Sequence, residues 1–124
     1  MSSTIWQNDL VIIEIEDSQN PWLKIFLKRT VKEFSNCTLE EKNIIWQCLD
    51  IIEKNMLDYY KCDKINIASF GNILPQVHFH ITARFKEDEF FPNPMWGEKL
   101  RQTKLNLPNF DKFVQKLKKN LVSL

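Results

Sequence analysis

The chain has two histidines, His78 and His80, and they lie two residues apart within residues 76–84. Polar and apolar side chains alternate along these residues, and a β-strand sends successive side chains to opposite faces. One face then carries an amide, two imidazoles, a hydroxyl and a guanidinium, from Gln76, His78, His80, Thr82 and Arg84. Two neighbouring imidazoles on a rigid strand, followed by a cation, predict a site for nucleophilic or acid–base chemistry on an anion.

Hydrophobic periodicity predicts the elements that position this strand. Apolar and β-branched runs predict strands over residues 10–15, 22–27 and 65–70, and a long histidine-bearing strand from residue 74 or 75 to 85. Thr38 and Glu41 form a capping-box pattern before a helix of about 22 residues. Its apolar stripe comprises Ile45, Cys48, Leu49, Ile52, Met56 and Tyr59. A second amphipathic helix is expected over residues 108–121.

The order of these elements predicts the fold class. Short turns join the paired strands, and one long helix stands between the two pairs, which is typical of an antiparallel sheet with helices on one face. Residues 87–97 contain two prolines and a glycine, which predict an irregular loop, although the loop carries four large apolar side chains. We therefore expect an α+β fold, with residues 1–124 forming a single domain.

Composition excludes several classes of function. A net charge of +1 and a hydrophobic content of 44% indicate an ordinary globular protein with no nucleic-acid or membrane partner. No apolar run approaches the roughly 20 residues of a membrane helix, and the first residues lack a secretory pattern. A cytoplasmic location is the expectation. The three cysteines lack a C-x-x-C pair, so we expect reduced structural thiols and neither a disulfide framework nor a zinc site.

Residues 71–84, with the sequence GNILPQVHFHITAR, resemble the signature of the histidine triad (HIT) family of nucleotide hydrolases and transferases. That signature has three alternating histidines, with a glycine five residues before the first. Gly71 sets the register, so that Gln76 falls on the first histidine, His78 on the second and His80 on the third. Residues 84–97, together with Asp17 and residues 20–22, resemble a bacterial branch often labelled diadenosine-tetraphosphate-hydrolase-like. The likeness spans about residues 10 to 100.

The resemblance implies a fold and a mechanism. The fold would be an antiparallel sheet of about five strands with a long helix and a C-terminal helix. His78 would attack the α-phosphorus of a nucleotide and form a nucleotidyl-histidine, which water then hydrolyses. His80 would bind a phosphate or leaving-group oxygen and supply a proton. Asp17 would contact ribose hydroxyls. The other implied substrate contacts are Asn66, Asn72, Gln76 and Arg84.

The resemblance also implies partners, and the sequence differs from the family pattern at two positions. It implies a homodimer formed through the long helix and one edge strand, a nucleotide as substrate, no cofactor and no metal in the chemical step. Gln76 cannot titrate as a histidine would, although it can still donate and accept hydrogen bonds. Trp22 replaces a further upstream histidine of many members.

Several alternatives remain open from the residues alone. The chain could be a nucleotide-binding module with weak chemistry, a small metalloprotein built on His78 and His80, or a protein in which both histidines are structural. Arg84 could contact phosphate or pair with a loop carboxylate. Residues 94–96 could be a hydrophobic plug on the core or a rim of the nucleotide pocket.

Overall fold

A computed structural model describes residues 3–124. Five strands form one antiparallel sheet in the order β1-β2-β3-β5-β4. The strands are β1 (Thr4–Gln7), β2 (Val11–Ile15), β3 (Trp22–Leu27), β4 (Lys64–Ala68) and β5 (His78–Arg84). The helices are the short 3-10 helix η1 (Phe34–Asn36), α1 (Leu39–Tyr60) and α2 (Phe110–Leu121). The predicted α+β class, with five strands, a long helix and a C-terminal helix, is confirmed.

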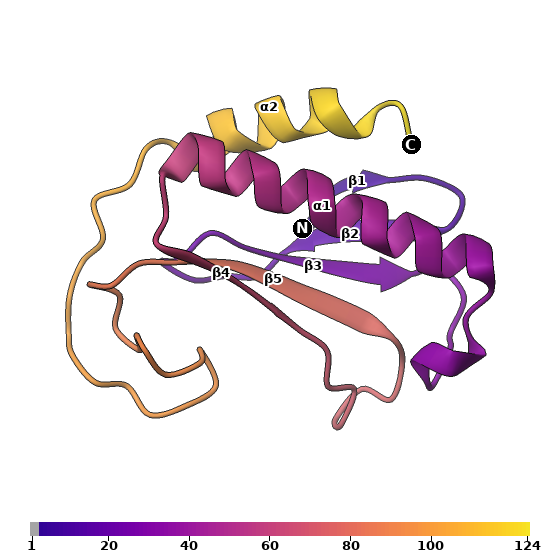
Figure 1. The fold of residues 1–124 in the computed structure, drawn as a ribbon, viewed down its shortest axis with the longest axis horizontal. Helices are drawn as coiled ribbons and strands as arrows, with labels where there is room; N and C mark the ends of the chain where they lie inside the picture. Colours follow the sequence, from indigo (N-terminus) through magenta and orange to yellow (C-terminus); the bar gives the residue numbers. More distant parts are fainter. Residues whose placement is uncertain (1–2) are drawn as a thin grey trace.

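The helices α1 and α2 lie over one face of the sheet (Figure 1). That face contributes Ile13, Leu23, Ile25, Ile81 and Ala83, all at most 1% exposed, to the hydrophobic core. Burial of such apolar surface contributes about 25 cal/mol per Å² and is the main force that holds the helices on the sheet. Because side chains alternate along a strand, the other residues of β3 and β5 must point to the opposite face.

The predicted capping box at the start of α1 is present. Glu41 N donates to Thr38 Oγ1 at 3.0 Å, and Thr38 N donates to Glu41 Oε1 at 2.8 Å, so each side chain satisfies a free end amide. The apolar stripe is also confirmed, with one difference at its end. Tyr60 is buried, whereas Tyr59 is half-buried and its hydroxyl donates to Asn109 O at 2.7 Å, at the start of α2.

The strand that carries the histidines is shorter than the sequence predicts, because it begins at His78 and not at residue 74 or 75. Gly71 has a φ of 67°, in the left-handed region that favours glycine. Gln76 N donates to Leu74 O within a turn, and Val77 N donates to Val31 O in the segment after β3, so these amides are used outside the sheet ladder. β4 likewise ends at Ala68, earlier than predicted. The edge strand β1 has no counterpart among the predicted runs.

No helix within residues 3–124 is long and apolar enough to cross a membrane.

Candidate active site

The imidazole of His78 is held in one orientation by two contacts. Its Nδ1 lies 2.9 Å from the carbonyl oxygen of Gln76. A carbonyl oxygen only accepts hydrogen bonds, so Nδ1 carries the ring hydrogen and Nε2 keeps its lone pair. Phe26 of β3, opposite His78 in the register, stacks on the ring at 4.9 Å with an interplanar angle of 13°. The site therefore presents Nε2 of His78 as a nucleophile or base.

The imidazole of His80 is held in the opposite tautomer. Trp22 Nε1 donates to His80 Nδ1 at 3.0 Å. Indole is only a donor, so Nδ1 of His80 is the acceptor and its ring hydrogen must lie on Nε2. Burial, and then the neighbouring His78, lower the pKa of His80 to about 4, which keeps its ring neutral near pH 7. The two rings lie 5.2 Å apart between centroids, one with a free lone pair and one with an N–H.

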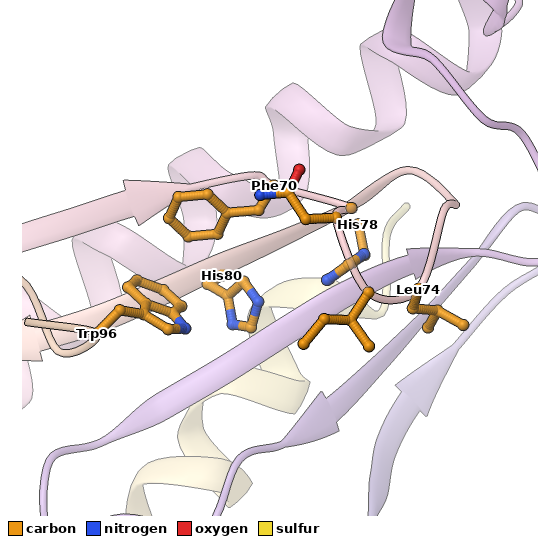
Figure 2. Close-up of a pocket in the computed structure, with 8 residues that line it drawn as sticks. Phe70, Leu74, His78, His80 and Trp96 are labelled. Atoms are coloured by element: carbon orange, nitrogen blue, oxygen red, sulfur yellow. The ribbon is translucent and has the colours of Figure 1, made fainter.

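Both histidines open onto one pocket of about 390 Å³ (Figure 2). Its walls are Phe70, Gly71, Asn72, Ile73, Leu74, His78, His80 and Trp96. Figure 2 shows the two imidazoles side by side, with Trp96 beside His80 and Leu74 at the His78 end. The lining is mostly apolar, with a few converging polar groups, as is usual for small-molecule sites.

The loop after β5 supplies one wall of this pocket through Trp96. The Trp96 ring packs edge-on against His80 at 4.9 Å, Phe70 at 4.7 Å and Trp22 at 5.2 Å. Trp96 is 47% exposed, so it does not plug the core. Of the two alternatives for residues 94–96, the structure supports a rim of the pocket.

Arg84 is buried in an ion pair and does not line the pocket. Its Nε and Nη2 donate to the two carboxylate oxygens of Asp88 at 2.9 and 3.1 Å, and both side chains are at most 1% exposed. Arg84 also donates to Asn66 Oδ1 at 2.7 Å and to Asn93 O at 2.8 Å. Of the two alternatives for Arg84, the structure shows the loop carboxylate as its partner. Asn66 belongs to the same network and does not line the pocket.

Asp88 organises the loop that leads to Trp96. It accepts hydrogen bonds from the side chains of Asn20 and Arg84 and from the backbone amides of Phe85, Phe90 and Phe91. Burial alone would raise the pKa of the Asp88 carboxyl, but the hydrogen bonds from Arg84, Phe85 and the others outweigh it and hold that pKa well below its usual range. Asp88 thus stays ionised, and sequence analysis did not single it out for this role.

The remaining predicted contacts lie at different distances from the histidines. Asn72 is in the pocket wall. The main-chain carbonyl of Gln76 accepts the hydrogen bond from His78 Nδ1. Gln76 also lines a separate hollow together with Phe26, outside the histidine pocket. Asp17 lies in another hollow of about 270 Å³, which has Trp22 among its walls. The structure therefore brings Asn72 and the histidines together and leaves Asp17 outside their pocket.

β3 places three side chains on the face of the sheet that carries the histidines, and of these the sequence had pointed to Trp22 alone. Trp22, Lys24 and Phe26 share one face of this strand, and in the register Lys24 lies opposite His80. Lys24 Nζ is 3.4 Å from Glu16 Oε1. The alternation along WLKIFL is visible in the sequence, but only the pairing of β3 with β5 shows that the face with Trp22, Lys24 and Phe26 lies beside the histidines.

No group of three or more His, Cys, Asp or Glu residues that could hold a metal ion occurs within residues 3–124. In the tautomer that the Trp22 contact implies, the hydrogen on His80 Nε2 also keeps that atom from binding a metal alongside His78 Nε2.

The fold is similar to that of several solved histidine triad proteins. A histidine triad protein from Bradyrhizobium japonicum superposes with a TM-score of 0.76 at 27% identity, covering 94% of this chain and 90% of the other. A histidine triad protein from Sinorhizobium meliloti gives a TM-score of 0.73 at 22% identity, covering 99% and 90%. One from Marinobacter aquaeolei gives 0.72 at 22%, covering 97% and 85%.

No protein-family model and no curated protein matches the sequence. The structural likeness supports the histidine triad family for this chain, and this fold suggests a nucleotide-binding hydrolase or transferase.

Proposed function

We propose that this protein is a nucleotide hydrolase or transferase that cleaves a phosphoanhydride or phosphoramidate bond at the α-phosphate, with a nucleotidyl-histidine as intermediate. Diadenosine tetraphosphate represents the substrate class of the bacterial branch that residues 84–97 resemble. The observation that carries the proposal is the hydrogen bond from His78 Nδ1 to Gln76 O, at 2.9 Å. It leaves the Nε2 lone pair available beside a pocket that can accept a phosphoryl group.

In the first step, Nε2 of His78 attacks the α-phosphorus, and the bond to the leaving oxygen breaks. The ring then carries a positive charge, and the carbonyl of Gln76 stabilises it through the Nδ1 hydrogen bond. His80 donates its Nε2–H to a phosphate oxygen. Asn72 and the turn amides around Gly71 lie in the wall where they can contact the same phosphate.

Other contacts follow the resemblance. We propose that Asp17 binds ribose hydroxyls of a nucleotide that extends past Trp22 into the neighbouring hollow. Gln76 would assist phosphate transfer through its main-chain carbonyl, which holds the ring of His78, and Arg84 with Asn66 would act by supporting the strand and the loop of Trp96. No metal takes part in the chemical step of this proposal.

The experiment that tests the proposal follows the adenylyl group. Incubation with diadenosine tetraphosphate labelled at its α-phosphates is expected to give AMP and ATP, and a rapid quench is expected to trap acid-labile label on the protein. Label formation should persist in the presence of EDTA. Tight binding of AMP by calorimetry without turnover on any nucleotide anhydride or amidate would instead identify a binding module.

We also propose a homodimer formed through β4 and α1. β4 is an edge strand of the sheet, and Ile67 on it is 45% exposed; Trp46 and Leu57 on α1 are 51% and 41% exposed. An open strand edge with apolar side chains favours pairing with another chain. Light scattering at micromolar concentration is expected to give twice the chain mass of 14.9 kDa. The substitution Ile67→Lys should shift the mass to that of a monomer, and a monomeric wild type would contradict the proposal.

A further inference from the structure

The hydrogen bond between Trp22 and His80 restricts what His80 can do. Trp22 Nε1 and His80 Nδ1 are 3.0 Å apart, and the two residues are 9% and 8% exposed. Trp22 also packs edge-on against Trp96 at 5.2 Å, and its place on β3 lies opposite Thr82 of β5. The indole is therefore held with its N–H aimed at His80. A second hydrogen on Nδ1 of His80 would face that N–H directly, so Nδ1 cannot take up a proton while the bond is intact.

Consequently, the one ring hydrogen of His80 lies on Nε2. If His80 passed this hydrogen to a leaving group as a proton, an anionic imidazolate would remain in a buried site, which is strongly unfavourable. A histidine that acts as a general acid must first hold two ring hydrogens, and Trp22 prevents that state. His80 can thus donate a hydrogen bond to a phosphate oxygen, but it cannot act as a general acid that protonates a leaving group.

The other groups around the pocket do not replace that proton. Among the described residues that line it, His78 and His80 are the titratable ones. The Nδ1–H of His78 is bonded to the carbonyl of Gln76, which cannot relay a proton. Lys24 on β3 lies opposite His80 in the register; it is paired with Glu16, and neither residue is part of the pocket wall. On the β4 side, His80 is opposite Ala68.

We infer that Trp22 is a specificity-determining residue: by holding His80 as a hydrogen-bond donor without a transferable proton, it restricts the site to substrates whose leaving group departs as a stable anion. This inference rests on the function proposed above and narrows it from two bond types to one. A phosphoanhydride such as a dinucleoside polyphosphate meets the condition, and a phosphoramidate, whose amine must be protonated to leave, does not.

The reaction balances without a general acid. Nε2 of His78 forms a bond to the α-phosphorus, and the electron pair of the breaking P–O bond stays on the bridging oxygen, which leaves as a phosphate anion. Terminal phosphates have a second pKa of about 6, so this anion is stable near pH 7. In the second step, water attacks the phosphorus, the P–N electron pair returns to His78 Nε2, and the water proton passes to solvent.

A matched pair of substrates tests the inference on the wild-type protein. Diadenosine tetraphosphate and adenosine 5′-phosphoramidate deliver the same adenylyl group to His78 and differ in the leaving group. Because a general acid contributes about 10²–10⁴-fold to rate, kcat/KM is expected to be at least about a hundredfold higher for the anhydride. Comparable values would overturn the inference and leave the proposed function standing. Absence of turnover and of label with both substrates would overturn the proposed function as well.

The variant Trp22→Phe isolates the role of the indole N–H, because phenylalanine keeps an aromatic ring and removes the donor. In this variant the indole no longer excludes a second ring hydrogen on His80, whose pKa burial and His78 still hold at about 4. An acidic limb is therefore expected to appear in the pH profile of amidate hydrolysis as the pH falls toward that value, and the preference for the anhydride is expected to fall there by about tenfold or more. Trp96→Phe is the matched control, since Trp96 packs on the same ring without a hydrogen bond and should leave the preference in place.

A direct measurement needs neither substrate nor variant. Nitrogen-15 NMR of the wild type is expected to show His80 with an unprotonated Nδ1 and a protonated Nε2 from pH 5 to 8. The opposite tautomer, or a ring that takes up a proton within this range, would overturn the inference.

Discussion

Replacement of His78 by alanine is expected to remove essentially all turnover of diadenosine tetraphosphate, a loss of about a thousandfold or more, and to abolish the acid-labile label. The proposed nucleophile is the Nε2 lone pair, and the other titratable side chain in the described pocket wall is His80. His80 cannot substitute, because its Nε2 carries the ring hydrogen. The measurement is steady-state kinetics together with quench labelling.

The interpretation requires that the variant stays folded, because His78 stacks on Phe26 and its loss removes that contact. Thermal unfolding of the variant, and the activity of Gln47→Ala at an exposed position on α1, control for global damage. A folded His78→Ala protein that keeps full activity would refute the nucleophile assignment. Retained AMP binding together with lost turnover would support it, since binding depends on the rest of the pocket.

The fold could be predicted from the sequence wherever periodicity is strong. The capping box at Thr38, the apolar stripe of α1 and the alternation through residues 78–84 are all present as expected. The start of β5 could not be predicted, because the backbone of residues 71–77 forms its hydrogen bonds outside the sheet ladder. Apolar residues such as Leu74 and Val77 make this segment look like part of the strand in the sequence. β1 is short and half-buried, so it has no alternating run to reveal it.

The sequence predicted the residues of the candidate site better than their hydrogen bonds. The histidine pair itself was visible, because both residues lie on one short segment. The tautomers of the two rings depend on Gln76 O and Trp22 Nε1, one a turn carbonyl and the other a side chain on β3. Long-range pairing of β3 with β5 creates the second contact, and no single-sequence pattern encodes a strand register of this kind. The same holds for Arg84, whose partner Asp88 lies in a loop with no periodicity.

Replacement of Asp88 by alanine is expected to lower the free energy of unfolding by about 3–5 kcal/mol, the largest stability effect of a single substitution that we expect here. The substitution leaves the guanidinium of Arg84 buried without its carboxylate, and it also deprives three backbone amides of their acceptor. A domain of this size has a total stability of about 5–15 kcal/mol, so the variant would be close to unfolding. Urea denaturation of both proteins measures the difference.

Two further variants distinguish the loss of the Arg84–Asp88 ion pair from a nonspecific loss of stability. Asp50→Ala removes the exposed pair with Lys54 and should change stability little, because solvent screens such pairs. The double variant Arg84→Met with Asp88→Leu should be less destabilised than the sum of the two single variants, since it leaves no buried charge unpaired. A loss below about 1 kcal/mol for Asp88→Ala would show that Arg84 finds another partner and that the pair does not hold the loop.

The ion pair also predicts how stability depends on pH. The folded-state pKa of Asp88 lies below its usual value of 3.8, so the stability that its carboxylate contributes is fully present above that value and is lost as pH falls through the lowered folded pKa. Acidification below about pH 4 should therefore destabilise the wild type more steeply than Asp88→Asn, which has no carboxylate to protonate at this position. Because the same loop places Trp96 against His80, the pocket should open in acid before the sheet unfolds. The part of the tryptophan fluorescence that is lost in Trp96→Phe should therefore change at a higher pH than far-UV circular dichroism.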